Sequence, residues 1–358
     1  ENGLCSPYAA FFDIDWNAAK NKVILPVLSS PYQPALEDGQ FTLILDDAGL
    51  FVQYRDYRLP LDIRSYRLVL SQRRDILEAA LGLSQPDLEP LFQLINTLEH
   101  LPSCTRLAPS QAGRRYHERQ AAKEAVRLVS RAPQIKTWLL GNIALFNSSQ
   151  ELMHSLLEQQ AYQLSFWRSA LEHLNYRRFF DVSDLIGLRA EEPDVFQASH
   201  ALILRLVKEG RVTGLRIDHI DGLRDPVQYL SRLQRHIAPE AKAGGLRLFY
   251  IVVEKILARD EVLPPDWPVF GTTGYDFANT LNALFVDSEG AGALDEIYYR
   301  FTGSQTAFSD VVYEKKKQVI AELFPGEMQA LGQLLAELTL QEKGTVKLST
   351  EELSEALG

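Results

Sequence analysis

Two stretches decide the predicted fold: Gly214-Leu215-Arg216-Ile217-Asp218-His219-Ile220-Asp221-Gly222-Leu223 and Leu248-Phe249-Tyr250-Ile251-Val252-Val253-Glu254. Each begins as a short, mostly apolar strand, and a helical pattern over 226–236 separates the two strands. The order strand, helix, strand predicts two neighbouring parallel strands. The unbroken apolar run of the second strand predicts burial on both faces. A third strand and its loop are expected within 269–276.

Asp218 and Glu254 stand where these two strands end. Neighbouring strands lie about 4.8 Å apart. Retaining glycosidases hold two carboxyl groups about 5–5.5 Å apart, and inverting ones about 6.5–9.5 Å. Arg216 shares a strand face with Asp218 and keeps it ionised, as a nucleophile must be. Burial at the end of an apolar strand is expected to raise the pKa of Glu254, which would suit it to general acid catalysis. A structural ion pair is the alternative.

The other segments differ in composition and pattern. Residues 1–64 predict a small strand and loop module, with a hairpin turn at Asp46-Asp47-Ala48-Gly49. Residues 65–175 predict a large helical insertion that ends in one long helix, Ser149 to Leu174. Residues 176–290 are expected to contain the central βα units, and 291–358 are expected to form a helical segment that is truncated. The predicted fold class is α/β.

Composition excludes several kinds of partner. The chain has 37 basic and 47 acidic residues, a net charge of −10, which argues against nucleic acid. No apolar run approaches the roughly 20 residues that cross a membrane, and no signal peptide is visible. Cys5 and Cys104 lack metal-ligand spacing and are expected to be reduced thiols of a cytoplasmic protein. No phosphate-binding loop or ligand cluster suggests a cofactor or metal.

Several motifs resemble those of known enzymes. Gly214–Asp218 and Val252–Lys255 resemble the second and third signature segments of the α-amylase superfamily of glycoside hydrolases. Longer runs are similar to the malto-oligosyltrehalose synthases of that superfamily: Ser6–Tyr8, Phe11–Trp16, Asn175–Val182, Asp184–Leu185, Gly187–Arg189, Arg216–Leu223, Ile251–Leu257, Leu263–Pro264, Trp267–Val269 and Gly271–Phe277. The resemblance spans nearly the whole chain. It implies the central portion of a (β/α)8 TIM-type barrel, with an inserted small β module and a large helical insertion.

The resemblance also implies an activity. The family isomerises maltodextrins by intramolecular transglucosylation, in which the reducing-end α-1,4 bond becomes an α,α-1,1 bond. By analogy, Asp218 attacks the anomeric carbon, Glu254 is the acid/base and Arg216 orients Asp218. A maltooligosaccharide is the implied substrate, in trehalose biosynthesis, and a trehalose-releasing hydrolase is the implied functional partner.

The cleaved glucose has to stay bound and turn while water is excluded, which suits aromatic and Arg side chains. The alternatives are core packing for Phe179 and Phe180, and a loop anchor for Tyr275. The expected sugar-binding residues are Arg177, Arg178, Phe180, Asp181, His219, Asp221, Lys255 and Tyr275.

Two family segments are absent from the sequence: the first signature, and a late His-Asp pair that supplies a third carboxylate. We therefore expect the central portion of a longer enzyme, without synthase turnover of its own. One alternative is another α-glucan hydrolase or transferase with the same pair, and another is a non-catalytic glucan-binding module. The runs Tyr176–Asp181 and Gly271–Phe277 favour the synthase.

Overall fold

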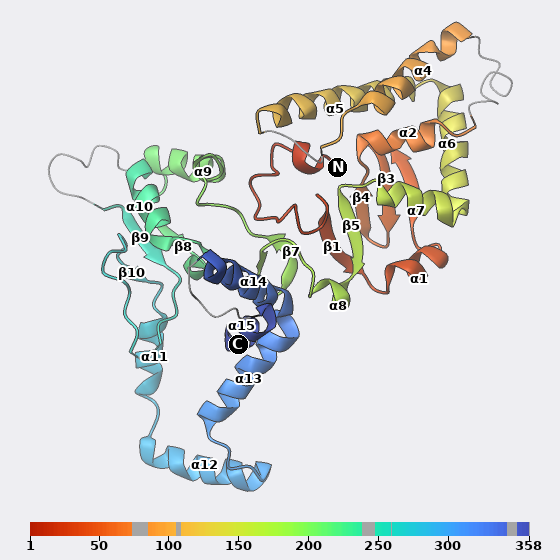
Figure 1. The fold of residues 1–358 in the computed structure, drawn as a ribbon. Helices are drawn as coiled ribbons and strands as arrows, with labels where there is room; N and C mark the ends of the chain where they lie inside the picture. The colour runs from red at the N-terminus through yellow and green to blue at the C-terminus, as the bar shows by residue number, and fades with distance from the viewer. Residues whose placement is uncertain (74–84, 105–108, 238–247, 259, 342–348, 358) are drawn as a thin grey trace. The chain divides into compact units, whose positions relative to one another are not determined.

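The computed structural model divides into two compact units (Figure 1). Unit 1 comprises Glu1–Gly187 and Lys317–Gly358, and unit 2 comprises Leu188–Lys316. The boundary falls within helix α13, Phe308–Leu323. The residues that the structure describes are 1–73, 85–104, 109–237, 248–258, 260–341 and 349–357.

Unit 1 contains an antiparallel meander of three strands: β2 (Thr42–Asp46), β3 (Gly49–Tyr54) and β4 (Tyr57–Pro60). The predicted hairpin turn between β2 and β3 is confirmed. Asp46 Oδ1 accepts a hydrogen bond from the N–H of Ala48 across 2.7 Å. Alternate residues of β3 (Leu50, Val52 and Tyr54) are buried, because successive strand residues face opposite sides of a sheet.

The helices of the predicted insertion share a hydrophobic core with this sheet. Leu50 and Val52 of β3 belong to the same buried cluster as Leu94, Leu139 and Phe146. Residues 1–64 and 65–175 therefore form one packed body, whereas the sequence patterns suggested two modules. The helices of this region are α1 (Tyr32–Glu37), α2 (Tyr66–Leu70), α4 (Gln85–His100), α5 (Pro109–Val129), α6 (Pro133–Ser148) and α7 (Gln150–Glu158).

The prediction of one long helix from Ser149 to Leu174 is wrong. Helix α7 ends at Glu158, and β5 (Tyr162–Phe166) follows and pairs in parallel with β1 (Val23–Leu28). Tyr162 and Leu164 are buried by this pairing. The leucine spacing is compatible with a helix, but a distant strand partner overrides local propensity.

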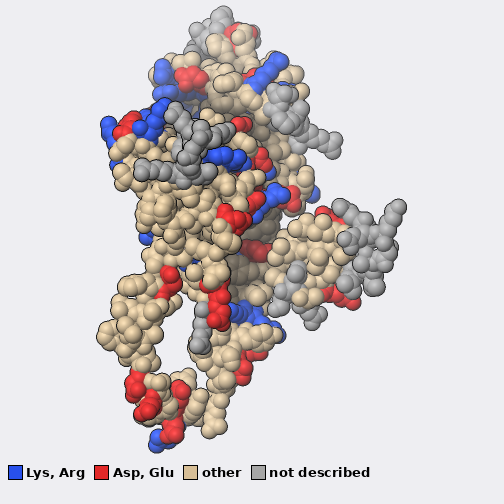
Figure 2. Space-filling model, turned by 90° about the vertical axis from the view of Figure 1, so that its left-hand side faces the viewer, with Lys and Arg blue, Asp and Glu red and all other residues tan. Residues whose placement is uncertain are grey.

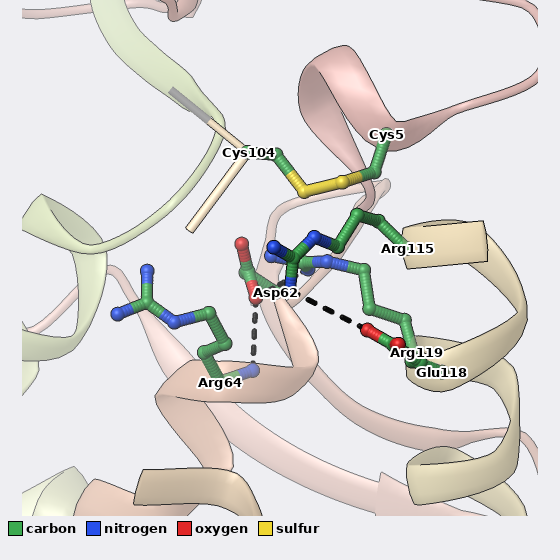
Figure 3. The surroundings of a disulfide bond; sticks show 7 residues. All are labelled: Cys5, Asp62, Arg64, Cys104, Arg115, Glu118 and Arg119. Carbon is green, nitrogen blue, oxygen red and sulfur yellow. Dashed lines mark hydrogen bonds and ion pairs between the residues drawn. A yellow bond between two sulfur atoms is a disulfide. The ribbon is translucent and has the colours of Figure 1, made fainter. Parts of the chain in front are cut away.

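Cys5 and Cys104 form a disulfide, so the expectation of two reduced thiols is wrong. Their Cα atoms are 5.5 Å apart, and the bond joins the short 3-10 helix η1 (Gly3–Cys5) to the segment after α4. Figure 3 shows the disulfide beside a buried ion pair, in which Arg119 Nη1 lies 2.7 Å from Asp62 Oδ1. Sequence spacing could not reveal the pairing, since the two cysteines are 99 positions apart.

A second hairpin and three further helices are also present among the described residues of unit 1. The hairpin strands pair antiparallel, Arg178 with Ile186 and Phe179 with Val182. A 3-10 turn, η2 (Ile63–Ser65), leads into α2 and is capped by the side chain of Asp62. The remaining elements are α8 (Trp167–Ala170), β6 (Arg178–Phe179), β7 (Val182–Ile186), α14 (Pro325–Gln341) and α15 (Thr350–Leu357).

Unit 2 contains the predicted strand–helix–strand unit. A parallel sheet has the order β10-β9-β8, and its elements in chain order are α9 (Pro193–Lys208), β8 (Gly214–Ile217), α10 (Pro226–Ile237), β9 (Tyr250–Val253) and β10 (Gly271–Thr272). Ile251 and Val253 are buried against Phe196 and Leu230 of the helices. The prediction that β9 is buried on both faces is wrong, because 53% of Tyr250 is exposed.

The later helices of unit 2 have an exposed apolar surface. Neither α11 (Tyr275–Ala283) nor α12 (Ser288–Thr302) has a buried residue, and α13 has none either. Among the large apolar side chains of these helices and their connections, those with the highest exposed fractions are Phe277, Leu284, Phe285, Leu294, Phe301 and Phe308. Figure 2 shows one face, on which Lys and Arg are interspersed with Asp and Glu. No helix in the described part of the chain is long and apolar enough to span a membrane.

Candidate active site

The two acidic residues stand at corresponding positions on neighbouring strands. Ile217 of β8 pairs with Val253 of β9, and the next residues are Asp218 and Glu254. The N–H of Glu254 donates to the carbonyl oxygen of Ile217 across 2.8 Å. Both carboxylates therefore project from the carboxyl ends of parallel strands, where open α/β sheets form their sites.

Arg216 contacts both carboxylates. Its Nε lies 2.6 Å from Asp218 Oδ1, and its Nη2 lies 3.6 Å from Glu254 Oε1. The exposed fraction is 59% for the Asp218 side chain and 28% for that of Glu254. The deep burial predicted for Glu254 is absent. A shared guanidinium offsets the repulsion that two adjacent carboxylates would otherwise have.

His219 follows Asp218 in a left-handed backbone conformation, with φ 53° and ψ 42°. This bend ends β8, and a 3-10 turn follows, η4 (Ile220–Gly222), with Ile220 fully buried. The N–H of His219 donates to Glu254 Oε2 across 3.2 Å. The imidazole lies directly against Gly222, where an added Cβ would overlap the ring. Position 222 therefore requires glycine if the His219 ring is to keep this position.

Tyr275, in the segment that follows β10, also contacts the carboxylate pair. Its hydroxyl donates to Glu254 Oε1 across 3.4 Å. It begins α11 directly after Gly274, whose φ of 101° suits glycine. Thr272 Oγ1 donates to Asp276 Oδ1 across 2.6 Å, and this hydrogen bond lowers the pKa of Asp276. The Gly-Thr-Thr-Gly-Tyr-Asp run therefore orders the loop that presents Tyr275.

Lys255 and Asp221, both predicted to bind sugar, contact each other. Lys255 Nζ lies 3.4 Å from Asp221 Oδ2 and 2.9 Å from Glu261 Oε1. The hydrogen bond to Glu261 is the main cause that raises the pKa of Lys255. The pKa of Glu261 is lowered, first by the N–H of Ala258 and then by Lys255. Sequence reasoning missed Glu261, because nothing in its spacing marks it as a partner of Lys255.

Arg177 and Arg178 belong to unit 1 and differ in environment. Arg177 is exposed and pairs with Asp13 through Nε at 3.1 Å. Arg178 is buried, with 1% of its side chain exposed. Its guanidinium donates to Glu327 Oε1 at 3.0 Å and to the carbonyl oxygens of Leu323 and Asp181. These contacts hold the guanidinium of Arg178 within unit 1, and its sugar contact stays a prediction.

Phe180 and Asp181 form the turn between β6 and β7. Phe180 has a positive φ of 50° and is 57% exposed, and Phe179 is 38% exposed. The two rings meet edge to face, with centroids 4.6 Å apart. The alternative of core packing for these rings is therefore wrong. Their position relative to the carboxylate pair, which belongs to unit 2, stays a prediction, as it does for Arg177.

Nothing in the described residues forms a group of three or more His, Cys, Asp or Glu side chains that could hold a metal ion. The strand ends themselves present two carboxylates, one guanidinium, an imidazole and a phenol. Such a set suits proton transfer and nucleophilic attack on an acetal carbon.

Comparisons with known proteins confirm the resemblance found in the motifs. No protein-family model matches the chain. A Mycobacterium tuberculosis protein with maltooligosyl trehalose synthase in its name is 46% identical over 137 residues, which are 38% of this chain and 17% of that protein. A solved glycosyltrehalose synthase aligns with 92% of this chain and 33% of its own, at 31% identity and a TM-score of 0.59. The maltooligosyltrehalose synthase of Arthrobacter ramosus aligns with 93% of this chain and 31% of its own, at 27% identity and a TM-score of 0.59. The chain thus spans about a third of these solved structures.

Proposed function

We propose that this chain contains the nucleophile and the acid/base of a retaining transglucosylase. The enzyme converts the reducing-end α-1,4 bond of a maltooligosaccharide into an α,α-1,1 bond and leaves a trehalosyl end. The observation that supports this most is the pair Asp218 and Glu254 at adjacent strand ends, joined by Arg216. The similarity to maltooligosyl trehalose synthases supports the choice of substrate.

In the first step, Asp218 attacks the anomeric carbon of the penultimate glucose. Its bond to O4 of the terminal glucose breaks, and Glu254 gives its proton to that oxygen. The sugar is now covalently bound to Asp218 with inverted configuration. The ion pair with Arg216, at 2.6 Å, supports Asp218 as the ionised nucleophile.

In the second step, the released glucose turns within the site and presents its anomeric hydroxyl. Glu254 takes the proton from this hydroxyl, whose oxygen attacks the anomeric carbon and displaces Asp218. Two inversions restore the α configuration. The donors around Glu254, from His219 and Tyr275, suit a group that alternates between acid and base because they hold both of its oxygens in place.

The proposal extends to the fold and the cellular setting. Three parallel strands, with a helix between the first two, support the central portion of a (β/α)8 barrel. A cytoplasmic location and a trehalose-releasing hydrolase as functional partner follow from the resemblance. A disulfide is unusual in the cytoplasm, so the redox state of Cys5 and Cys104 bears on the location.

Product analysis tests the proposal. The protein encoded by the complete reading frame is incubated with maltopentaose, and reducing ends and trehalosyl products are measured. We expect loss of reducing ends without a fall in sugar mass, and a loss of activity of about 10⁴-fold or more in Asp218→Asn. A gain of reducing ends would indicate a hydrolase. Maltodextrin binding without turnover, unchanged in Asp218→Asn, would indicate a binding module. The 358-residue chain alone is expected to lack turnover, because it spans about a third of its solved relatives.

A further inference from the structure

A three-residue ion cluster lies next to the carboxylate pair. It consists of Asp221 in the turn after β8, Lys255 directly after Glu254, and Glu261 in the loop after β9. We infer that Lys255, held by Asp221 and Glu261, is a positioning residue that fixes the acid/base Glu254, and that it does not bind sugar. This inference rests on the proposed function.

The cluster joins the two loops at the point where the strand ladder stops. The pairing of the two strands ends at Ile217 and Val253, and the N–H of Glu254 still donates to the carbonyl oxygen of Ile217. Beyond it, the chain after β8 turns sharply through His219, and the chain after β9 continues as a loop. The contact from Lys255 to Asp221, at 3.4 Å, therefore connects the two loops where backbone pairing no longer does.

Glu261 is held by hydrogen bonds within its own loop as well as by its contact with Lys255. Its Oε2 accepts from the N–H of Ala258 across 3.0 Å, and its own N–H donates to the carbonyl oxygen of Ala258 across 3.1 Å. The other carboxylate oxygen, Oε1, takes the ammonium of Lys255 at 2.9 Å. Only 17% of the Lys255 side chain is exposed, against 40% for Glu261. Lys255 is thus the least exposed side chain of the cluster, and contacts from both loops hold its ammonium.

Lys255, whose side chain is fixed in this way, is the residue directly after Glu254. A general acid has to lie within hydrogen-bond reach of the leaving oxygen, and a shift of about 1 Å can cost up to 100-fold in rate. Loss of the cluster is therefore expected to slow the steps that use Glu254. It is expected to spare a step in which the leaving group needs no proton.

A comparison of leaving groups tests this in the protein encoded by the complete reading frame. Maltopentaose needs protonation of its leaving O4, whereas α-maltosyl fluoride releases fluoride without an acid. In Lys255→Met we expect kcat on maltopentaose to fall about 10- to 100-fold, with KM changed less than about twofold. First-turnover fluoride release is expected to change less than about threefold. Lys255→Arg is expected to restore most of the rate.

Glu261→Gln provides a second variant, because its exposed position makes a folding failure less of a concern. We expect it to lower kcat on maltopentaose about 3- to 10-fold, again without an effect on fluoride release. The matched control is Glu209→Gln, which removes a glutamate that is 41% exposed and pairs with Arg211 at 3.0 Å. This control is expected to leave both rates unchanged.

The outcomes separate the inference from the function on which it rests. A raised KM with unchanged kcat in Lys255→Met would make Lys255 a sugar contact and overturn the inference. Equal slowing of both substrates, or no effect in either variant, would also overturn it. If the wild-type protein turns over neither substrate, the proposed function itself fails, and the inference fails with it.

Discussion

The backbone N–H of His219 donates to Glu254 Oε2 across 3.2 Å, so the residue after the proposed nucleophile holds the proposed acid/base. The same bend places the His219 imidazole against Gly222. A change in the turn after β8 therefore acts on both carboxylates. This coupling makes the turn a sensitive place to test the proposed site.

Gly222→Ala is expected to displace the His219 imidazole, because the new Cβ would overlap the ring. We expect the rate of trehalosyl-end formation to fall about 10- to 100-fold, since displacing a group in the site by about 1 Å can reduce the rate by up to about 100-fold. Stability is expected to change little, because the atoms that the new Cβ would overlap belong to a side chain and not to the backbone. Steady-state kinetics and thermal unfolding measure the two effects.

Gly292→Ala serves as the control for that substitution. Gly292 lies within α12, and an added Cβ there meets no atom within 4 Å. Alanine favours a helix, so stability is expected to rise by about 0.4–1 kcal/mol with no effect on the rate. An unchanged rate in Gly222→Ala would show that the His219 ring takes no part in the reaction.

Arg178→Met is expected to destabilise unit 1 by about 2–4 kcal/mol, because it removes a buried guanidinium that donates to the carbonyl oxygen of Leu323 and pairs with Glu327. Arg177→Met, at an exposed ion pair with Asp13, is expected to cost about 0–1 kcal/mol. Urea unfolding of both variants measures the difference. A stable Arg178→Met protein with a raised KM would instead support the predicted sugar contact of Arg178.

Reduction of the Cys5–Cys104 disulfide is expected to lower the stability of unit 1. The cysteines are 99 positions apart, and loss of a cross-link over a loop of this length costs about 2–5 kcal/mol. Denaturant midpoints with and without dithiothreitol measure the effect. The double variant Cys5→Ala/Cys104→Ala is expected to show no response to the reductant. Two free thiols in protein that is isolated and denatured without reductant would contradict the pairing.

His200 is expected to make the stability of unit 2 depend on pH. Its ring stacks on Phe196, and its Nε2 lies 2.8 Å from the hydroxyl of Tyr229. Burial lowers the pKa of His200 below the ordinary value of 6.5, and burial also raises the pKa of Tyr229 to about 12. At pH values between the folded pKa of His200 and 6.5, the unfolded chain binds more protons than the folded chain. The stabilisation from the neutral ring is therefore fully present above pH 6.5 and is lost as the pH falls through this window.

His200→Gln removes the titrating group and is expected to flatten this part of the pH dependence. Hydrogen exchange of β8 and β9 peptides between about pH 7 and pH 5 follows the stability of unit 2. The exposed His173→Gln in unit 1 is the control and is expected to leave the dependence unchanged. An identical pH dependence in wild type and His200→Gln would show that the neutral ring is not required.

The strands of unit 2 could be predicted because their signal is local. β8 and β9 are each followed by an acidic residue after a short, mostly apolar run, and β8, α10 and β9 all appear where the pattern indicated. The segment 159–166 could not be predicted, since Tyr162 and Leu164 are strand residues only because β1 pairs with them. At Tyr250 the local signal itself gave a wrong prediction. Its apolar ring indicated burial, but that face of β9 is open.

Within the candidate site, sequence spacing located the residues that share one strand end. Asp218, Glu254 and Arg216 meet because strand pairing follows from the pattern. The partners of Arg178 and Lys255 could not be predicted, because they depend on loop paths and distant helices. Glu327 lies 149 positions from Arg178, and no spacing rule relates the two.

The parallel pairing of β1 with β5 has a consequence during synthesis. β1 ends at Leu28, and its partner begins only at Tyr162. At about 5–20 residues per second, a nascent chain displays β1 without its neighbour for roughly 7–30 s. An unpaired apolar strand edge is a template for association with other chains. Slower translation between these two strands would therefore be expected to increase the demand of this protein for chaperones.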